Sequence, residues 1–300
     1  MKQNINKILA FYLITLIFFS IFYLYFKFQT GNDSTIAEWL INYEGGFTKR
    51  GLVGQISVII SRLIDIDLRL TIFLLQSLAY CIYFICIFNF FKFYEFNRIS
   101  LLALFSPIFI LYPIAEIEVL ARKELFIFSF LLSYLLIKDI NIKSLFIFLT
   151  LPLCILIWEP VIFFFLFFLA IEIINYNCKN IKEILIHRIY IFIPSIIIAF
   201  YIIFNPITVE NHEIMKNYLK INFNENCYMS CQLLISKSTI YQQFNPISKY
   251  NFEVVIRYIL IMIIGFGPLL FLSYYSKLKL RKLFFFDKFN SLFAPLLILL

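Results

Sequence analysis

Residues 8–26 read ILAFYLITLIFFSIFYLYF, a stretch of nineteen residues without a single charge. An α-helix needs about 20 apolar residues to cross the hydrocarbon core of a membrane. The stretch is longer than the apolar region of a secretory signal, roughly 7 to 15 residues, and no small-residue cleavage site follows it. We therefore interpret it as a retained first membrane span.

The rest of the chain repeats this composition. Hydrophobic residues make up 62% of the 300 residues and aromatic residues 20%, which is more apolar surface than a soluble core of this length can hide. Further spans are expected at residues 70–91, 101–114, 125–137, 145–158, 161–176, 189–204 and 254–275. A ninth begins at Leu292, where the abrupt end indicates an incomplete chain or a short last helix. The sequence predicts an all-α protein, a single polytopic integral membrane helix bundle with about 8–9 transmembrane helices.

The charges are distributed unevenly between the two sides of this bundle. With the N-terminus inside, the inner segments hold 14 of the 26 Lys and Arg residues, whereas 13 of the 18 Asp and Glu residues lie outside. Cytoplasmic loops retain cations in this way. We expect an N-terminus inside the cell, and we interpret the net charge of +8 as an insertion signal rather than a nucleic-acid-binding surface.

This orientation leaves two long extracytoplasmic segments, residues 27–69 and 205–253. The second contains Cys227 and Cys231, which could form a disulfide in an oxidising compartment, remain free thiols, or bind a metal. A closed zinc site has four ligands, and only His212 lies nearby as a further nitrogen ligand. No metal site and no definite cofactor are predicted, although a divalent cation is a possible cofactor.

The first outer segment contains two expected membrane-lying helices. Residues 34–38 read STIAE and resemble a capping box, which predicts a short helix through residues 39–43. Apolar residues then recur at helical spacing between Leu52 and Ile64, with Gln55, Ser57 and Ser61 off the stripe. This second run is too short to span comfortably and is typical of an amphipathic helix in the membrane surface.

Between these helices, residues 42–55 read NYEGGFTKRGLVGQ. The stretch holds four of the seven glycines in the chain, and we assign structural roles to Gly45, Gly46 and Gly54 because glycine permits tight turns. If the amphipathic helix begins at Gly51, its N-terminus and the neighbouring Lys49 and Arg50 form a site suited to a phosphate or carboxylate. Simple contact of the two cations with lipid headgroups is the alternative.

Other charges lie at the boundaries of the expected spans. Arg122, Lys123 and Glu124 follow one another in an outer turn and are either a solvated connector or part of a site. Glu159 stands alone in a very apolar stretch, between a tryptophan and a proline. Because charges at such positions are costly and usually face a cavity or one another, Glu159 is a candidate for catalysis or for an ion pair.

The glycine-containing stretch and the charged residues at the span boundaries resemble motifs of a known group of proteins. The string from Asn42 to Gly54, followed by Arg122-Lys123-Glu124 and Trp158-Glu159, resembles uncharacterised bacterial polytopic membrane proteins of surface-polysaccharide gene clusters. The topology, with one span before a large outer segment, is similar to the fold of C-type glycosyltransferases. The motifs cover about the first half of the chain, and the remainder resembles the group in topology alone.

The resemblance implies a multi-pass protein of the bacterial inner membrane that acts, as a glycosyltransferase or polysaccharide polymerase, on polyprenyl-phosphate-linked sugars at the outer face. Asp33 or Glu38 would accept the proton of the acceptor hydroxyl, and Glu159 would orient a cation or the substrate. The lipid phosphate would contact Lys49, Arg50, Gly51, Arg122 and Lys123. Membrane lipid and the lipid-linked sugar are the expected partners. A transporter or flippase of a lipid-linked or anionic solute, and a non-catalytic assembly subunit, are the alternatives.

Overall fold

The computed structural model describes residues 2–30, 34–92, 120–165 and 189–227, together with positions 104, 105, 110, 111, 114, 168, 231, 234, 235, 252, 256, 259, 260 and 263. Every regular element in these residues is a helix, which confirms the all-α prediction. In chain order the helices are α1 (Lys2–Thr30), α2 (Ser34–Ala37), η1 (Glu38–Leu40), α3 (Gly51–Ile64), α4 (Leu68–Phe91), α7 (Glu124–Leu136), α8 (Ile140–Ile157), η2 (Glu159–Phe164), η3 (Ile189–Phe192), α11 (Ile193–Phe204) and α12 (Val209–Phe223).

Three of these helices are long and apolar enough to cross a membrane, over Asn4–Thr30, Leu68–Phe91 and Ile140–Ile157. A fourth crossing is available if the segment Ile189–Phe204 and the helix Val209–Phe223, bent by 99° at their break, form one span. Helices α3 and α7 are apolar but shorter. Most residues of the spans expected at 101–114, 161–176 and 254–275, and the start of a ninth at Leu292, lie outside the described residues.

Side-chain caps define where several helices begin. Asp67 accepts hydrogen bonds from the backbone of Arg69 and Leu70 at the start of α4, and Asp139 accepts from Asn141 and Ile142 at the start of α8. Such caps satisfy the first backbone donors, which have no partner inside the helix. The short helix expected through residues 39–43 instead ends at Leu40, because the chain becomes extended at the next residue and leads into the glycine-containing turn.

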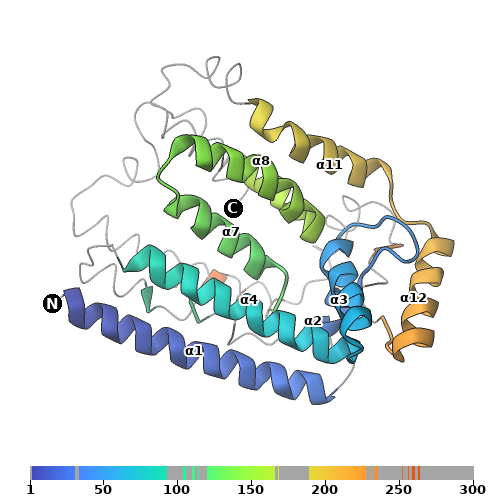
Figure 1. Ribbon diagram of the computed structural model, residues 1–300, viewed down its shortest axis with the longest axis horizontal. Helices are drawn as coiled ribbons and strands as arrows, with labels where there is room; N and C mark the ends of the chain where they lie inside the picture. Colours follow the sequence, from blue (N-terminus) through green and yellow to red (C-terminus); the bar gives the residue numbers. More distant parts are fainter. Residues whose placement is uncertain are drawn as a thin grey trace.

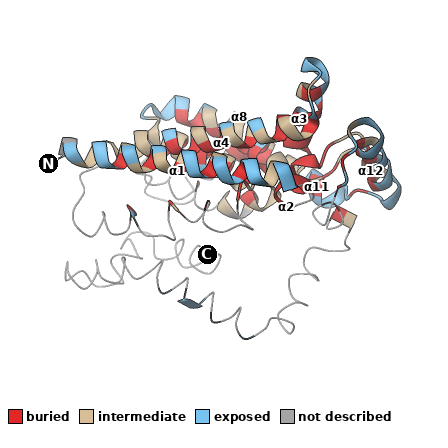
Figure 2. Ribbon diagram, turned by 90° about the horizontal axis from the view of Figure 1, so that it is seen from below, coloured by how far each residue is buried: buried red, intermediate tan, exposed pale blue. Residues whose placement is uncertain are grey.

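Helices α1, α4, α7, α8 and α11 run alongside one another, while α3 and α12 lie across one end of this bundle (Figures 1 and 2). The end of α1, the start of α4, the start of α7 and the end of α8 also lie at this end, which we call the site end (Figure 1). The N-terminus lies at the other end, which we call the N-terminal end. The segments that the sequence assigns to alternate sides of a membrane therefore separate in space.

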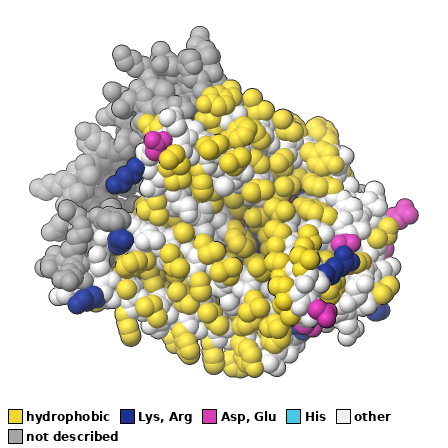
Figure 3. Space-filling model, in the orientation of Figure 1, with side chains coloured by type: hydrophobic (Ala, Val, Ile, Leu, Met, Phe, Trp, Pro, Cys, Tyr) yellow, Lys and Arg dark blue, Asp and Glu magenta, His cyan; other side chains and the backbone are white. Residues whose placement is uncertain are grey.

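The sides of the bundle expose large hydrophobic residues to an unusual degree. Phe11 is 75% exposed, Phe18 67% and Ile203 67%, whereas three clusters of buried residues fill the spaces between the helices. Figure 3 shows hydrophobic side chains across the middle of one face, with the charged side chains near its two ends. An apolar belt of this kind is typical of a surface that faces lipid.

Helix α3 turns its apolar stripe outward. Ile56 is 42% exposed, Ile59 45% and Leu63 79%, while Gly54, Ser57 and Ser61 are on the buried face. Small residues allow helix backbones to approach closely when the surroundings are as apolar as the core. Small residues that lie off the predicted apolar stripe, together with Val53 and Val58, are thus buried, and most of the stripe is left on the outside.

Candidate functional site

The glycine-containing turn joins η1 to α3 and is fixed by its own side chains. Asn42 donates to the carbonyl of Leu40 at 3.0 Å and accepts from the backbone of Glu44 at 2.9 Å. Gly46 has a φ of 107°, a conformation that residues with a side chain rarely adopt. The turn ends at Arg50, whose φ of 63° is left-handed, and α3 begins at Gly51 as the sequence predicts.

Close packing accounts for two further glycines, one in α3 and one in the turn. A Cβ atom at Gly54 would overlap the carbonyl groups of Trp39 and Ile41, so α3 lies directly against η1 at this point. A Cβ atom at Gly45 would overlap the Asn211 carbonyl of α12. The structural roles assigned to these glycines thus correspond to contacts between backbones, and Gly45 marks the place where α12 covers the turn.

Arg50 is the centre of a charge cluster at the site end. Its Nε and Nη2 atoms donate to the two carboxylate oxygens of Glu159 at 2.7 and 3.0 Å, a bidentate fork. Its Nη1 atom donates to Glu38 at 3.3 Å. The Lys49 ammonium lies 3.6 Å from the same Glu159. Two segments that are far apart in the sequence, residues 38–50 and the start of η2, meet here.

The 120–124 turn contributes two cations with different surroundings. Lys123 is completely buried, and its ammonium donates to the backbone carbonyl of Arg50 at 2.6 Å. Arg122 has a side chain 38% exposed and pairs with Glu124 at 3.0 Å. Both were expected to contact a substrate phosphate. In this structure the Arg122 side chain is partly exposed to solvent, whereas the Lys123 side chain is closed off from solvent.

Mutual pairing determines the protonation of the cluster. Burial alone would lower the pKa of Arg50 and raise that of Glu159, but their hydrogen bonds and opposite charges outweigh it, so the Arg50 pKa is raised and the Glu159 pKa is lowered. Burial lowers the pKa of Lys123 to about 8, although the nearby charge of Glu38 opposes this effect. Glu159 is therefore held as a carboxylate beside a permanent cation.

Several polar atoms beside the cluster are buried without a hydrogen-bond partner among the described residues. They include the hydroxyl of Tyr43, the indole nitrogen of Trp158 and the Nε atom of Arg122. The Tyr43 ring lies against Gly51, and the other two adjoin cluster residues in the chain. A buried donor without a partner costs free energy that a polar ligand could restore.

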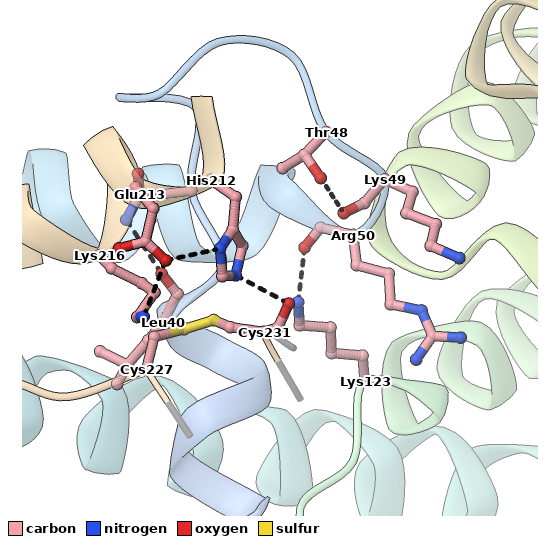
Figure 4. Close-up of a disulfide and its surroundings, with 11 residues drawn as sticks. Leu40, Thr48, Lys49, Arg50, Lys123, His212, Glu213, Lys216, Cys227 and Cys231 are labelled. Carbon is pink, nitrogen blue, oxygen red and sulfur yellow. Dashed lines mark hydrogen bonds and ion pairs between the residues drawn. A yellow bond between two sulfur atoms is a disulfide. The ribbon is translucent and has the colours of Figure 1, made fainter. Parts of the chain in front are cut away.

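Helix α12 and the segment after it cover the other side of the turn. Arg69 at the start of α4 donates to Glu225 through two hydrogen bonds of 2.7 Å. Cys227 and Cys231 form a disulfide with their Cα atoms 5.6 Å apart, and the His212 ring bonds the carbonyl of Cys231 at 3.0 Å. Figure 4 shows this disulfide near Lys123 and Arg50, with the Lys49 and Arg50 side chains extending away from it.

His212, the further nitrogen ligand considered for a metal site with the two cysteines, thus forms a hydrogen bond to the backbone of Cys231. In the part of the chain that the structure describes, no group of three or more His, Cys, Asp or Glu side chains is arranged to hold a metal ion. The carboxylates of Glu38 and Glu159 converge instead on the guanidinium of Arg50. Asp33, the other candidate proton acceptor, lies outside the described residues.

The 120–124 turn is held by contacts with η1 and α4 that were not predicted from the sequence. Trp39 donates from its indole nitrogen to the carbonyl of Ala121 at 2.8 Å, and the backbone N–H of Ala121 donates to the Tyr80 hydroxyl at 2.9 Å. Ala121 has a φ of 51°, which no glycine in the sequence signals. These contacts fix the 120–124 turn on η1 and α4.

No protein-family model, curated protein or solved structure matches the chain. The chemistry must therefore be inferred from the site itself. A carboxylate held ionised, a second carboxylate at hydrogen-bonding distance from the same arginine, and a lysine at the rim can together bind a phosphate and accept a proton.

Proposed function

We propose that the chain is a multi-pass protein of the bacterial inner membrane that transfers sugars from polyprenyl-phosphate carriers, as a glycosyltransferase or polysaccharide polymerase acting at the outer face. The observation that carries this proposal is the convergence of charges from three distant segments on Arg50, at one end of an apolar helix bundle. Perturbed ionisable groups gathered in this way are typical of functional sites.

The proposal includes a bundle of about 8–9 spans, and two features support a site end outside the cell. Among the described residues, the N-terminal end carries Lys7, Lys92, Lys138 and Lys143 with Asp139 as its one acid, whereas cations and acids balance at the site end; short cytoplasmic loops carry such an excess of cations. The site end carries the Cys227–Cys231 disulfide, and disulfides persist in oxidising compartments outside the cytoplasm. Charge balance and cysteine pairing are independent signals, and both favour an N-terminus inside.

Lys49 is the cation best placed to bind the lipid phosphate. Its side chain is 26% exposed, and its ion pair with Glu159 is long, at 3.6 Å. The Arg50 guanidinium is already engaged by two carboxylates, so its role is to orient Glu159 and Glu38. Helix α3 begins next to Lys49, and the positive end of its dipole favours an anion at the same place.

The exposed apolar stripe of α3 supports a lipid-linked substrate rather than a soluble one. Ile56, Ile59 and Leu63 are exposed along the helix whose first residue adjoins the charge cluster. A phosphate held at Lys49 would therefore have apolar surface within reach for its polyprenyl chain. An amphiphilic substrate needs this combination of a charged site and an adjoining apolar face.

In the proposed reaction, the acceptor hydroxyl oxygen forms a bond to the anomeric carbon of the sugar. The bond between that carbon and the phosphate oxygen breaks, and the phosphate leaves with the electron pair. Glu38, or Asp33, takes the hydroxyl proton as the general base. Lys49 neutralises the charge that develops on the departing phosphate, and Arg50 keeps Glu159 oriented beside it.

A transfer assay tests this proposal. Purified protein in lipid vesicles is supplied with labelled polyprenyl-phosphate sugar and a crude glycan acceptor, and both transfer and movement across the bilayer are measured. We expect transfer by the wild type and at least a tenfold loss for Lys49→Gln. The matched control is Arg62→Gln on the exposed part of α3, which should keep its activity. Movement of the carrier without transfer would instead identify a flippase. The absence of both transfer and movement would contradict the proposal.

A further inference from the structure

Lys123 is the one cation of the charge cluster that solvent cannot reach. Its exposed fraction is 0%, and its ammonium is 2.6 Å from the Arg50 carbonyl oxygen. Lysine is rarely buried completely unless it is paired, so its position calls for an explanation. A lipid phosphate at the rim of the cluster would meet Lys49 and would not meet Lys123.

We propose that Lys123 is a positioning residue, which holds the left-handed turn at Arg50 so that the guanidinium of Arg50 faces Glu159. This role replaces the phosphate contact that the sequence predicts for Lys123. The positioning role concerns an ion pair within this chain and does not depend on the proposed function. Only the expected effect of Lys123 on sugar transfer rests on that function.

The backbone at Arg50 needs such support. Its φ of 63° lies in the left-handed region, and α3 begins at the next residue without a side-chain cap. A residue other than glycine is strained in this conformation and keeps it only where its surroundings enforce it. The hydrogen bond from Lys123 to the Arg50 carbonyl is assisted by the charge of the ammonium, and it acts directly on the strained peptide unit.

Lys123 is itself held by a rigid frame. Two residues earlier, Ala121 is also left-handed, with a φ of 51°. Its carbonyl accepts from Trp39 of η1, and its N–H donates to Tyr80 of α4. A series of contacts thus runs from α4 and η1 through the 120–124 turn to Arg50, and ends at the fork with Glu159.

The surrounding charges make this arrangement sensitive to pH. Glu38, Glu159 and Glu124 favour the charged ammonium, while Arg50 and burial disfavour it, and burial has the largest effect on the Lys123 pKa, which falls to about 8. The pKa of lysine in an unfolded chain is about 10.4. Between about pH 8 and pH 10 the unfolded chain therefore binds more protons, and the contribution of Lys123 to stability rises with pH. The hydrogen bond from Lys123 to the Arg50 carbonyl loses the assistance of the ammonium charge over the same pH range and therefore weakens.

A double-mutant cycle tests the proposal without any transfer assay. The coupling between Arg50 and Glu159 is measured by thermal unfolding of Arg50→Gln, Glu159→Gln and the double variant, first with Lys123 and then with Lys123→Met. We expect Lys123→Met to reduce this coupling at least twofold. The matched control is the Arg69–Glu225 fork, whose coupling should not change. An Arg50–Glu159 coupling that survives Lys123→Met would overturn the proposal.

The same cycle at two pH values serves if Lys123→Met does not fold. Coupling is measured at pH 7 and pH 9.5 in a Lys49→Met background, which removes the lysine that contacts Glu159. We expect the Arg50–Glu159 coupling to fall at pH 9.5 while the Arg69–Glu225 coupling holds. Equal coupling at both pH values would contradict a hydrogen bond to the Arg50 carbonyl that depends on the charge of Lys123. These outcomes are independent of sugar transfer, so a failure of the proposed function would be seen separately, as absent transfer by the wild type.

Discussion

Two arginine–glutamate forks connect distant parts of the chain, and their surroundings differ. Arg69 and Glu225 join α4 to the end of α12 through two bonds of 2.7 Å. Arg50 and Glu159 join the glycine-containing turn to the start of η2 in the same bidentate geometry. The second fork also contacts Glu38 and Lys49 and has a buried lysine on its backbone. Geometry alone would make both forks structural ties, but the Arg50 fork also carries a second carboxylate in contact with its guanidinium and two neighbouring lysines.

The two forks differ in what they need: an ion pair that only stabilises the fold needs fewer charges than one that belongs to a functional site. A single ion pair is enough to tie two segments, and the Arg69 fork is reinforced nearby by a disulfide, since Cys227 follows Glu225 by two residues. Extra charges within a half-buried cluster cost desolvation energy that stability alone does not repay. We therefore assign a structural role to the Arg69 fork and a functional role to the Arg50 fork.

The largest expected effect is on sugar transfer. Arg50→Gln should lower the transfer rate by a hundredfold to a thousandfold, the loss typical of removing one electrostatic group from a preorganised site. Arg69→Gln should stay within about twofold of the wild type at equal amounts of folded protein, because its fork lies outside the charge cluster. Initial rates in vesicles, normalised to folded protein, compare the two. Equal losses for both variants would remove the distinction between the forks.

The second effect is on stability. Glu159→Gln and Glu225→Gln should each cost about 3 kcal/mol, because either change removes the charged partner of a bidentate fork. The pH dependence distinguishes Glu159, whose pKa is lowered in the folded state. A carboxylate with a lowered pKa stabilises the fold above its ordinary pKa of about 4.3, and this contribution is lost as the pH falls through the folded value.

Thermal unfolding between pH 6 and pH 3 measures that loss. The difference in stability between the wild type and Glu159→Gln should shrink as the pH falls below about 4.3. A difference that stays constant over the whole range would show that the charge of Glu159 does not matter.

The smallest expected effect concerns the disulfide beside the Arg69 fork. Replacing both cysteines by alanine should cost about 2 kcal/mol, since the closed loop is short and constrains little of the unfolded chain. Hydrogen exchange should increase in α12 near the fork and change little in the 120–124 turn. An increase centred on the 120–124 turn instead would mean that the disulfide supports the charge cluster directly.

Much of the bundle was predictable because long uncharged runs have few alternatives. The runs at 8–26 and 70–91 became α1 and α4, and the break at Trp158-Glu159-Pro160 ended α8 where the apolar pattern stops. That Glu159 would need a partner followed from its isolation in an apolar stretch, since such charges seek one another. The count of spans and their orientation stay predictions.

Other features had no signal in the sequence. A helical period yields an apolar stripe on α3 but does not say whether the stripe faces protein or lipid, because both are apolar. Of two consecutive cations, the sequence could not tell that Lys123 is buried and that Arg122 reaches the surface. The left-handed backbone at Ala121 depends on contacts from Trp39 and Tyr80, which are distant in the chain.

The central claim is that the Arg50 cluster binds the phosphate of a polyprenyl lipid through Lys49. The two tryptophans of the chain, Trp39 and Trp158, both adjoin this cluster, so their fluorescence reports on it directly. Vesicles that contain the protein are titrated with polyprenyl phosphate. We predict a saturable fluorescence change for the wild type and for Arg62→Gln, and at least a tenfold weaker affinity for Lys49→Gln. A titration that Lys49→Gln leaves unaltered, or a wild type with no saturable change, would contradict the claim.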